Sequence, residues 1–297
     1  MLFASGFHIA MIPSSTNWKR ILVQINGETK LIGFFGSTYR TSKMYAVYNA
    51  AMEALGLNYL YVPFIVHDLQ KAVEGMRHLG IAAAGVTIPY KISIIPFLDE
   101  LDAEAKMVGA VAVVVNRDGK LIGGTTDGQG ALKALQEKTD VAGKRVVLIG
   151  AGGAARAIAF SLHQAGGKLT VLNRAEEIAM AESLGQDLGC PWGDFSRLET
   201  SVREADIVIH TTPVGMANTP LAGRSLISPE LLRPDMTVMD IVTHPRKTQL
   251  LQDAEGRGCR VVYGERMLLW QGVYKFKLYT GVEPPVEVME QAMERMK

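Results

Sequence analysis

A glycine-rich segment carries the residue spacing with the clearest chemical meaning. In residues 146–157, VVLIGAGGAARA, a run of branched aliphatic residues ends in glycines and continues into residues that favour helix. A strand, turn and helix in this order leave free backbone N–H groups at the helix start, where they can bind a pyrophosphate. Gly150 and Gly152 permit the tight turn, and Gly153 lets the backbone approach a ligand. Because the small Ala154 also allows close helix packing, the segment predicts a dinucleotide site, with a purely structural turn as the alternative.

The residues after the next predicted strand bear on the choice of cofactor. This strand, residues 168–172, ends at Asn173 and Arg174, about where the ribose of a bound adenosine would lie. A guanidinium offers a planar pair of donors to a 2′-phosphate, which favours NADP. Glu176 and Glu177 follow, and their carboxylates would repel a phosphate but accept a hydrogen bond from a free ribose hydroxyl. NADP is therefore the expected cofactor, with NAD as the alternative.

Length and composition are typical of a globular protein that binds small molecules. The chain of 297 residues, 48% of them hydrophobic, can bury a full core and is long enough for two domains. A formal net charge of +1 gives no field that would attract nucleic acid or an anionic membrane. Cys190 and Cys259 cannot form a disulfide framework, so we expect a reducing cytoplasm. Residues 1–11 lack a basic segment and are too short to span a bilayer, so no signal peptide is expected.

Metal and covalent chemistry are not indicated by the sequence. The six histidines show no ligand spacing, and neither cysteine has the close-spaced partners of a zinc site. The chain has no G-x-S-x-G motif that would predict a serine nucleophile. We therefore expect a catalytic site without a metal ion.

Apolar periodicity predicts alternating strands and helices in the first part of the chain. Residues 20–36 contain Asn26-Gly27, which is typical of a hairpin turn; a single strand at residues 31–36 is the alternative. Further strands are predicted at residues 59–64 and 82–88, with helices at residues 42–55 and 68–79. A second hairpin is predicted around Asp118-Gly119, between residues 111–115 and 121–122. This alternation is typical of an α/β domain with a largely parallel sheet.

The alternation restarts around the glycine-rich segment and predicts a doubly wound, Rossmann dinucleotide-binding domain. A helix at residues 130–137 leads into it, and strands follow at residues 168–172, 206–211, 237–241 and 260–263. The expected fold is therefore α/β with two domains, a substrate domain at residues 1–128 and a dinucleotide domain at residues 129–271. The last helices, at residues 267–279 and 286–296, are expected to carry residues 272–297 back to the first domain, with a cleft between the domains.

Four motifs surround the glycine-rich segment in a consistent order. They are GVTIPYK at residues 85–91, TTDGQG at residues 125–130, TTPVGM at residues 211–216 and GERMLLWQ at residues 264–271. Each motif is loose by itself, but the four together, on both sides of a dinucleotide-binding segment, form a specific pattern. From about residue 31 to its end, the chain resembles the shikimate/quinate dehydrogenase family.

The resemblance implies that Lys91 is the catalytic lysine and Asp127 its partner, close to the substrate hydroxyl whose carbon gives a hydride to the nicotinamide. Oxidising an alcohol requires a group that takes the hydroxyl proton, and reducing a ketone requires a donor to the same oxygen. A partly desolvated lysine can serve in both directions, while a nearby carboxylate fixes its position. Taken singly, Lys91 is more typical of a solvated surface lysine, and Asp127 of a turn residue.

The resemblance also implies binding roles for residues of less specific type. Ser42, Thr87 and Gln271 match positions that bind the substrate. The implied cofactor-binding positions are Gly150, Gly152, Gly153, Ala154, Asn173, Arg174, Thr211, Pro213, Met216, Gly264 and Met267. Threonine in a strand, glutamine in a helix and methionine in a core are ordinary residues, so each of these positions also has a structural alternative.

Several departures from the family pattern bear on the substrate. The S-x-S motif that binds the substrate carboxylate is Ser42-Lys43-Met44 here, and three usual asparagines and a tyrosine are replaced by Gly85, Ala112, Thr125 and Thr243. At about 1 to 1.5 kcal/mol for each lost hydrogen bond, these changes are expected to cost about 4 to 7 kcal/mol, or roughly three to five decades in catalytic efficiency with shikimate, which argues against shikimate as the physiological substrate. A contact with a carboxylate could be recovered by Lys43, by His244 or by Tyr48, which stands where the family usually has histidine.

Two functions are consistent with these observations. One is a dehydrogenase that acts on a secondary alcohol of a hydroxylated cyclic acid or related polyol, and the other is a regulatory NAD(P)-binding relative without turnover. Retention of both Lys91 and Asp127 favours the enzyme, because a pure binder has no evident need for the pair. A folate-linked dehydrogenase fits the motifs less well. We expect a monomer or homodimer with a small-molecule substrate.

Overall fold

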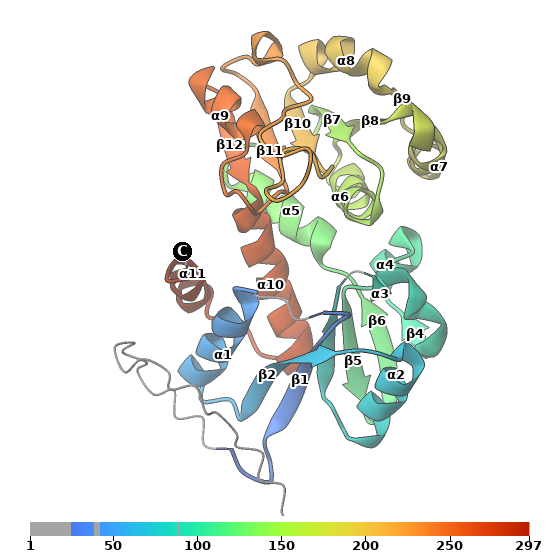
Figure 1. Ribbon diagram of the computed structural model, residues 1–297, viewed down its shortest axis with the longest axis vertical. Helices are drawn as coiled ribbons and strands as arrows, with labels where there is room; N and C mark the ends of the chain where they lie inside the picture. The colour runs from blue at the N-terminus through green and yellow to red at the C-terminus, as the bar shows by residue number, and fades with distance from the viewer. Residues whose placement is uncertain (1–24, 39–41, 88, 297) are drawn as a thin grey trace, which may run out of the picture.

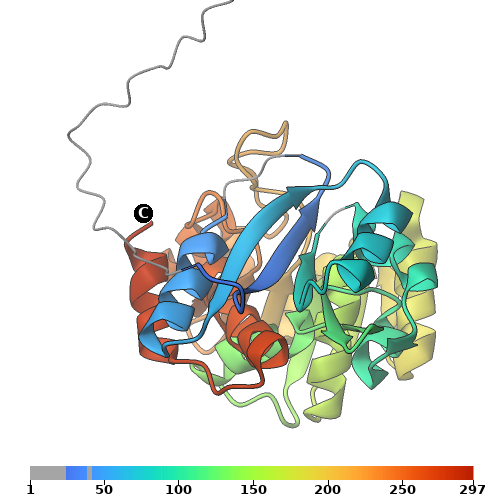
Figure 2. The ribbon, with the colours of Figure 1, turned by 90° about the horizontal axis from the view of Figure 1, so that it is seen from below.

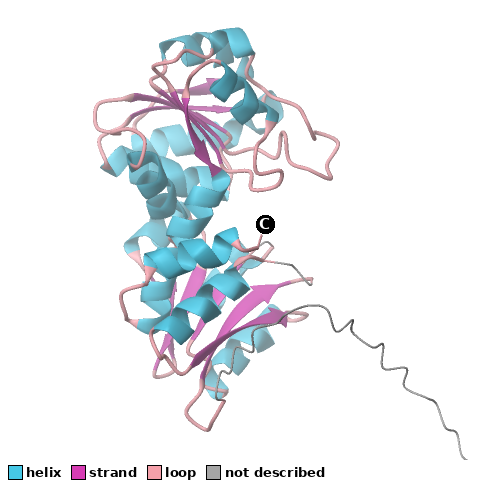
Figure 3. Ribbon diagram, turned by 90° about the vertical axis from the view of Figure 1, so that its left-hand side faces the viewer, coloured by secondary structure: helices cyan, strands magenta, loops and turns pink. Residues whose placement is uncertain are grey.

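Two β-sheets, one above the other, form the framework of the protein (Figures 1 and 3). The computed structural model describes residues 25–38, 42–87 and 89–296. Each sheet has six strands. Within the described residues, no helix is long and apolar enough to cross a membrane. The predicted α/β class with two sheets is confirmed.

The first sheet consists of β1 Lys30–Gly36, β2 Tyr59–Ile65, β3 Ala83–Val86, β4 Glu100–Leu101, β5 Val113–Arg117 and β6 Lys120–Gly124. Its strand order is β2-β1-β3-β5-β6-β4. The strands β1, β2 and β3 are parallel, whereas β5 is antiparallel to both β3 and β6. Consequently β3 and β6 point the same way, and both end at the same edge of the sheet.

The two halves of the protein are the parts built around the first and the second sheet. The helices of the first half are α1 Met44–Ala54, α2 Leu69–His78, α3 Tyr90–Ser93 and α4 Ala103–Val108. Neighbouring strand residues point to opposite faces of the sheet, so Ala83 packs toward the side of α1 and Ala84 toward the side of α2. The carboxylates of Asp68 and Asp102 cap α2 and α4, because each accepts a backbone N–H from the first turn. The same strand alternation thus builds both layers of the first half.

The predicted hairpin around Asp118-Gly119 is confirmed as the β5–β6 turn. Asp118 and Gly119 have positive φ angles of 52° and 89°, as a type I′ turn requires. The other predicted hairpin, around Asn26-Gly27, is not formed by the described residues, because β1 pairs in parallel with β2 and β3 instead. Residues 20–24 and the apolar residues 1–11 lie outside the described residues.

The second sheet consists of β7 Arg145–Ile149, β8 Lys168–Asn173, β9 Trp192–Asp194, β10 Ile207–His210, β11 Thr237–Asp240 and β12 Arg260–Tyr263. All of its pairings are parallel, and its strand order is β12-β11-β10-β7-β8-β9. This is the doubly wound order in which the direction of winding changes between β7 and β10. The Rossmann arrangement predicted around the glycine-rich segment is therefore confirmed.

The remaining helices are α5 Asp127–Gln136, α6 Gly153–Gln164, α7 Ile178–Leu188, α8 Leu198–Glu204, α9 Gln249–Gly256, α10 Gly264–Thr280 and α11 Val286–Glu294. Short 3₁₀ helices occur at Ile95–Phe97, Ala175–Glu177, Phe195–Arg197 and Pro229–Leu231. In β7, Leu148 faces the core under α6, whereas Ile149 faces the opposite core under α8 and α9. The strand is apolar throughout because both of its faces are covered.

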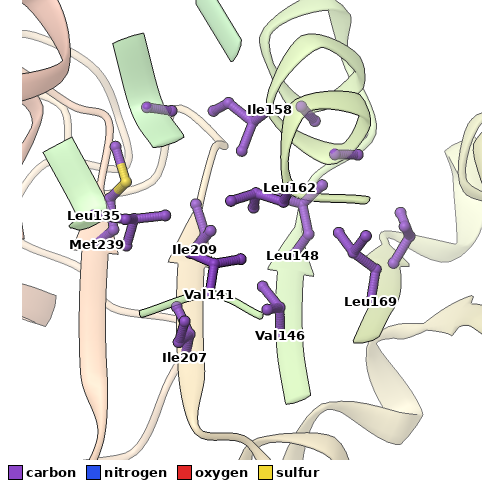
Figure 4. Close-up of a cluster of buried hydrophobic side chains, with 14 of the residues drawn as sticks. Leu135, Val141, Val146, Leu148, Ile158, Leu162, Leu169, Ile207, Ile209 and Met239 are labelled. Atoms are coloured by element: carbon purple, nitrogen blue, oxygen red, sulfur yellow. The ribbon is translucent and has the colours of Figure 1, made fainter. Parts of the chain in front are cut away.

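Figure 4 shows the core that fixes the strand before the glycine-rich turn. Leu148 of β7 and Ile209 of β10 lie between Leu135 of α5 and Ile158 and Leu162 of α6, and all five side chains are fully buried. Each such side chain stabilises the fold by about 1.5–3 kcal/mol through burial. The turn at Gly150 is thus held by packed elements on one side of the sheet.

The helices α5 and α10 connect the two halves (Figure 1). They pack against each other, and α10 contributes Met267 to the core of the second half and Phe276 to that of the first. The helix α11 then packs on α1, as Figure 2 shows from below. The domain boundaries predicted after residues 128 and 271 fall inside α5 and α10. These helices therefore belong to both halves, and the division into domains stays a prediction.

Candidate active site

The carboxyl ends of β3 and β6 bring Lys91 and Asp127 together. Lys91 lies in the short helix α3 after β3, and Asp127 is the first residue of α5, shortly after β6. The N–H of Val111 donates to the carbonyl of Lys91 at 2.8 Å, which ties α3 to the segment before β5. Because β3 and β6 end at the same edge, residues 36 positions apart in the sequence become neighbours.

Lys91 and Asp127 form a close, partly buried ion pair. Lys91 Nζ donates to Asp127 Oδ2 at 2.5 Å, and the two side chains are 28% and 7% exposed. Burial opposes ionisation of Asp127, but the ammonium groups of Lys91 and Lys275 outweigh it and lower the pKa of the carboxyl group. The second oxygen, Asp127 Oδ1, is buried and has no hydrogen-bond partner among the described residues. This oxygen can accept a hydrogen bond from a ligand.

Sequence analysis missed a second lysine at this pair. Lys275 of α10 places its Nζ 4.0 Å from Asp127 Oδ1, and its side chain is only 13% exposed. Burial lowers the pKa of Lys275 to about 8, although Asp127 opposes this shift. The signal was present in the sequence, because Lys275 follows the predicted substrate residue Gln271 by four positions and so lies on the same face of a helix.

The three predicted substrate-binding residues lie on different elements. Ser42 Oγ accepts a hydrogen bond from the N–H of Met44 at 3.2 Å, just before α1, and Thr87 directly follows β3. The backbone carbonyl of Gln271 accepts a hydrogen bond from Thr126 Oγ1 at 3.1 Å. This bond holds Gln271 next to the start of α5 and hence next to the Lys91–Asp127 pair, whereas a role for Ser42 and Thr87 stays a prediction.

The structure gives Lys43 a partner other than a substrate. Lys43 Nζ lies 2.5 Å from Glu265 Oε1, and Arg246 lies 3.0 Å from the other oxygen of the same carboxylate. Met44, which replaces the second hydroxyl of the S-x-S motif, is buried in the core of the first half. An ammonium already paired in this way does not support the expectation that Lys43 recovers the lost carboxylate contact.

The turn after β7 has the geometry of a dinucleotide-binding loop. Gly150 has a φ of +106°, and a Cβ there would lie 2.4 Å from Thr211 Oγ1, so only glycine fits. A Cβ on Gly152 or Gly153 would meet nothing within 4 Å. Gly152 is the N-cap of α6 and no described side chain caps this helix, so its first N–H groups are available. These features fit a pyrophosphate, and Ala154 follows in the first turn.

The end of β10 closes the same site from the neighbouring strand. Thr211 donates two hydrogen bonds to the carbonyl of Ile149, from its N–H at 2.9 Å and from its Oγ1 at 2.7 Å. These bonds join the ends of β7 and β10, where the winding of the sheet reverses and dinucleotides bind in such folds. Pro213 and Met216 follow in a loop, and Met216 is 39% exposed.

The end of β8 presents the predicted adenosine contacts. Asn173 is buried and its Nδ2 donates to the carbonyl of Glu177 at 2.9 Å. Arg174 is exposed and pairs with the carboxylate of Glu177. A bound 2′-phosphate must therefore compete with Glu177 for the guanidinium. Arg174 and Glu177 thus have opposite effects on binding of a phosphate, as the sequence suggested.

The start of α10 shows a packing role for its two predicted cofactor residues. A Cβ on Gly264 would lie 2.6 Å from the carbonyl oxygens of Ile241 and Val242, so glycine allows the helix to start against this loop. Met267 is 5% exposed and lies in the core of the second half. Met267 is therefore a core residue, which was the structural alternative for this position. Contact of Gly264 or Met267 with the nicotinamide stays a prediction.

A buried polar network next to this site was also missed. His210 Nδ1 lies 3.1 Å from Asp240 Oδ1, and Thr248 Oγ1 donates to Asp240 Oδ2 at 2.6 Å. His210 and Asp240 end the neighbouring strands β10 and β11, so the network connects the two strand ends below the loop at Thr211. Strand-ending polar residues in a hydrophobic run were the signal that could have revealed it.

Family models and relatives agree on where this chain belongs. The model described as shikimate dehydrogenase substrate binding domain matches residues 34–114, shikimate/quinate 5-dehydrogenase matches residues 132–253, and the shikimate 5′-dehydrogenase C-terminal domain matches residues 264–294. A shikimate dehydrogenase (NADP(+)) of Methanothermobacter thermautotrophicus is 41% identical over 279 residues, covering 92% of this chain and 98% of the relative. A Pyrococcus abyssi protein of the same name is 42% identical, with 90% and 98% covered.

Solved structures give the same assignment. Shikimate 5-dehydrogenase from Listeria monocytogenes, in complex with shikimate and NAD, matches with a TM-score of 0.85 and 37% identity, covering 90% of this chain and 97% of that one. The 5-ketofructose reductase of Gluconobacter sp. strain CHM43 matches with a TM-score of 0.82 and 29% identity, covering 92% and 100%. The chain therefore belongs to the shikimate dehydrogenase family, whose members are NAD(P)-dependent oxidoreductases that act on CH–OH groups.

Proposed function

We propose that this protein interconverts a secondary alcohol and a ketone on a shikimate-like or quinate-like hydroxylated ring, with NADP as its cofactor and with Lys91 and Asp127 as its catalytic residues. The observation that carries the proposal is the 2.5 Å contact between Lys91 Nζ and Asp127 Oδ2, beside Asp127 Oδ1, which is buried and accepts no hydrogen bond from the described residues. A carboxylate held in this way offers one oxygen to the lysine and keeps the other for the substrate.

Lys91 and Asp127 act together in the transfer of one proton. In the oxidation, bound NADP would supply the acceptor for the hydride that leaves the carbon of the alcohol. The hydroxyl on this carbon donates toward the Lys91–Asp127 pair, and Lys91 in its amine form takes the proton. In the reduction, the Lys91 ammonium donates to the carbonyl oxygen. Asp127 keeps the lysine in place through Oδ2 in both directions.

The cofactor assignment follows from the loop and from the end of β8. The N–H groups of the first turn of α6, next to Gly152 and Gly153, would bind the pyrophosphate. Arg174 would bind the 2′-phosphate after exchanging its pairing with Glu177. The curated relatives named above carry NADP(+) in their names, which supports the same choice.

The choice of substrate rests on relatives as well as on the site. The Listeria structure contains shikimate, and the Gluconobacter protein is named for the neutral ketone 5-ketofructose. Both compounds carry several hydroxyl groups near the reacting carbon. The assay panel should therefore contain shikimate, quinate and 5-ketofructose, each with NADP and with NAD in the matching redox state.

A steady-state assay on the purified full chain tests the proposal. We expect formation of NADPH from NADP⁺ with shikimate or quinate, and loss of this activity in Lys91→Ala. Calorimetric titration of the same variant with NADP⁺ should show unchanged binding, because Lys91 lies in the first half and the loop at Gly150 in the second. Cofactor binding by the wild type without turnover of any compound in the panel would contradict the proposal.

We further propose a reducing, intracellular compartment for the protein and a monomeric or homodimeric state. Both cysteines are free, and Cys259 is buried while Cys190 is partly buried. Burial raises the pKa of each thiol, which makes both groups poor nucleophiles. Sedimentation velocity would distinguish the monomer from the homodimer.

A further inference from the structure

The helix α10 directs three polar side chains toward the same region. Gln271, Lys275 and Tyr279 are spaced four residues apart and therefore share one face of the helix. Gln271 lies beside the start of α5, and Lys275 lies 4.0 Å from Asp127 Oδ1. Tyr279 is 4% exposed. This face runs along the Lys91–Asp127 pair and ends at β3.

Tyr279 lies where a family residue is missing. A Cβ placed on Gly85 of β3 would be 2.9 Å from Tyr279 Oη and 3.0 Å from Tyr61 Oη. The family usually has asparagine at the position of Gly85, so its side chain would occupy the space that these hydroxyl groups occupy here. Tyr279 Oη is buried and interacts with the hydroxyl groups of Tyr61 and Tyr48, but it makes no hydrogen bond of good geometry within the described part of the chain. The Tyr279 hydroxyl of α10 thus occupies the space in which the family has the asparagine carboxamide of β3.

Lys275 is likewise without an adequate partner. Its Nζ makes only the 4.0 Å contact with Asp127 and no hydrogen bond to any of the described residues. Together with Lys91 and Asp127, it gives the cluster two positive charges and one negative charge. A buried surplus charge is costly unless an acceptor satisfies it. An acceptor brought by a ligand would remove this cost.

We propose that Lys275 is a specificity-determining residue whose ammonium group binds a second oxygen of the substrate, next to the oxygen that Lys91 binds. This inference rests on the proposed function and names a feature of its substrate. Because both ammonium groups flank one carboxylate, the two oxygens belong to neighbouring carbon atoms, as in a vicinal diol or a hydroxyketone. The Tyr279 hydroxyl lies where the carboxamide absent at Gly85 would be.

The charge state of Lys275 makes this contact dependent on pH. The pKa of Lys275 is lowered to about 8, first by burial and then by Lys91, while Asp127 opposes the shift. The tyrosines around it, Tyr48 of α1, Tyr61 of β2 and Tyr279, have raised pKa values and stay neutral in this range. The Michaelis constant should therefore rise as the pH increases through 8, where the ammonium loses its proton.

The test compares Lys275→Met and Lys275→Gln with Lys277→Met. Lys277 lies on the same helix, is 56% exposed and pairs with Glu283 at the surface, so its variant is the matched control. We expect the KM for shikimate to rise about tenfold to a hundredfold in Lys275→Met, as for the loss of a charged hydrogen bond, and kcat to change less. Lys275→Gln should be intermediate and should lose the pH dependence near 8.

A shikimate analogue without the hydroxyl next to the reacting carbon separates a contact from a packing effect. This analogue should bind equally well to the wild type and to Lys275→Met. If Lys275 had only a structural role, the substitution would weaken binding of shikimate and of the analogue to the same extent. If the wild type oxidises shikimate and Lys275→Met does so with an unchanged KM, the inference fails and the proposed function stands. If the wild type oxidises neither shikimate nor quinate, calorimetry of shikimate binding decides the inference, and the proposed function fails if no compound of the panel is turned over. Equal binding by wild type and variant, or none by the wild type, would overturn the inference.

Discussion

Asp127 lies between two lysines that reach its carboxylate from different parts of the chain. Lys91 contacts one oxygen at 2.5 Å, and Lys275 approaches the other at 4.0 Å. Burial favours the protonated carboxyl group, yet the pKa of Asp127 is lowered, because the two ammonium groups outweigh burial. The carboxylate is therefore ionised at neutral pH and holds both lysines in the site.

Replacing this carboxylate should separate chemistry from cofactor binding. In Asp127→Asn the shape is kept, but Lys91 loses its charged partner, so we expect kcat to fall by about 10²- to 10⁴-fold. The affinity for NADP⁺ should not change, because the glycine-rich turn lies on the other sheet. Steady-state kinetics and calorimetric titration with NADP⁺ measure the two quantities.

The matched control for this variant is Glu100→Gln. Glu100 also pairs with a lysine, Lys120, but both side chains are about half exposed, so the loss of this pair should leave kcat and stability nearly unchanged. A decrease of less than tenfold in kcat for Asp127→Asn would show that the Lys91–Asp127 pair does not carry the chemistry.

The choice between NADP and NAD should depend on Arg174. Its guanidinium is exposed, and its one ion pair among the described residues is with Glu177, so it can exchange partners with a phosphate. In Arg174→Ala we expect the Kd for NADP⁺ to rise about tenfold or more, with little change in the Kd for NAD⁺. Glu177→Gln removes the competing carboxylate and should tighten binding of NADP⁺. Calorimetric titration with NADP⁺ and with NAD⁺ measures both affinities.

Arg203→Ala is the control for these cofactor variants. Arg203 pairs with Glu199 one helical turn away, at a similar exposure, but on α8 and far from the end of β8 in the sequence. Its replacement should change neither affinity. If Arg174→Ala weakens binding of NAD⁺ as strongly as binding of NADP⁺, Arg174 does not recognise the 2′-phosphate.

The Lys91–Asp127 pair could be predicted from the sequence, but the residues around this pair could not. Lys91 and Asp127 stand in motifs with fixed spacing, so their types and order were sufficient. Lys43 was expected to be available for a carboxylate, and the structure pairs it with Glu265, 222 positions away. Lys275 stands in no motif: its spacing of four residues from Gln271 was the one signal, and its contact with Asp127 depends on which face of α10 meets α5. Side-chain partners of this kind follow from packing and not from local sequence.

At the scale of elements, the β7–α6 turn combines two different uses of glycine. Gly150 has a left-handed conformation against Thr211, so its role is to permit the fold. Gly152 has an ordinary φ of −73° and open space where a Cβ would lie, so no fold requirement explains it. The available N–H groups of α6 suggest that this space is needed by the cofactor.

Alanine at these two positions should therefore give different results. Gly150→Ala combines a strained backbone with a 2.4 Å clash, and we expect it to destabilise the protein by about 2 kcal/mol or more. Gly152→Ala should keep the stability of the wild type but weaken NADP⁺ binding. Thermal unfolding without cofactor and calorimetric titration test the pair. Unchanged NADP⁺ affinity in Gly152→Ala would show that the cofactor does not approach this glycine closely.

Elements that apolar spacing or capping residues mark were predictable, and strands of two or three residues were not. The strands β8 and β12 and the helix α2 agree with their predicted ranges to within about one residue, because apolar spacing and capping residues mark them. The two-residue strand β4 and the three-residue strand β9 are too short to show any periodicity. Their pairing depends on the sheets that they join.

At the scale of the whole molecule, the two halves are joined by helices and by side chains. The helices α5 and α10 pack together, and Lys43 beside α1 pairs with Glu265 at the start of α10. The sequence predicted two α/β units and the return of the last helix to the first; α11 packs on α1, and the division into domains stays a prediction. It did not reveal these joining contacts, because they connect residues that are distant in the chain.

Glu104 is a titratable group at one of these junctions. It lies in α4 of the first half and accepts hydrogen bonds from Gln129 of α5 at 2.9 Å and Ser161 of α6 at 3.5 Å. Burial is the main reason that its pKa is raised to about 7, and the nearby Asp102 and Asp127 add to the shift. Below this pH the group is neutral, and above it a carboxylate stands between the halves.

This shift predicts how stability depends on pH. The folded protein keeps a proton on Glu104 that the unfolded chain loses near its ordinary pKa of 4.5, so this residue lowers the free energy of unfolding as the pH rises from about 4.5 to 7. Glu104→Gln keeps the shape and cannot ionise, and it should stabilise the protein by about 1 kcal/mol at pH 7 relative to pH 4.5, after allowance for partial exposure. Denaturant unfolding at both pH values measures the difference, with the exposed Glu199→Gln as control. An equal difference from wild type at the two pH values would show that Glu104 does not titrate between them, and that the junction carries no pH-dependent charge.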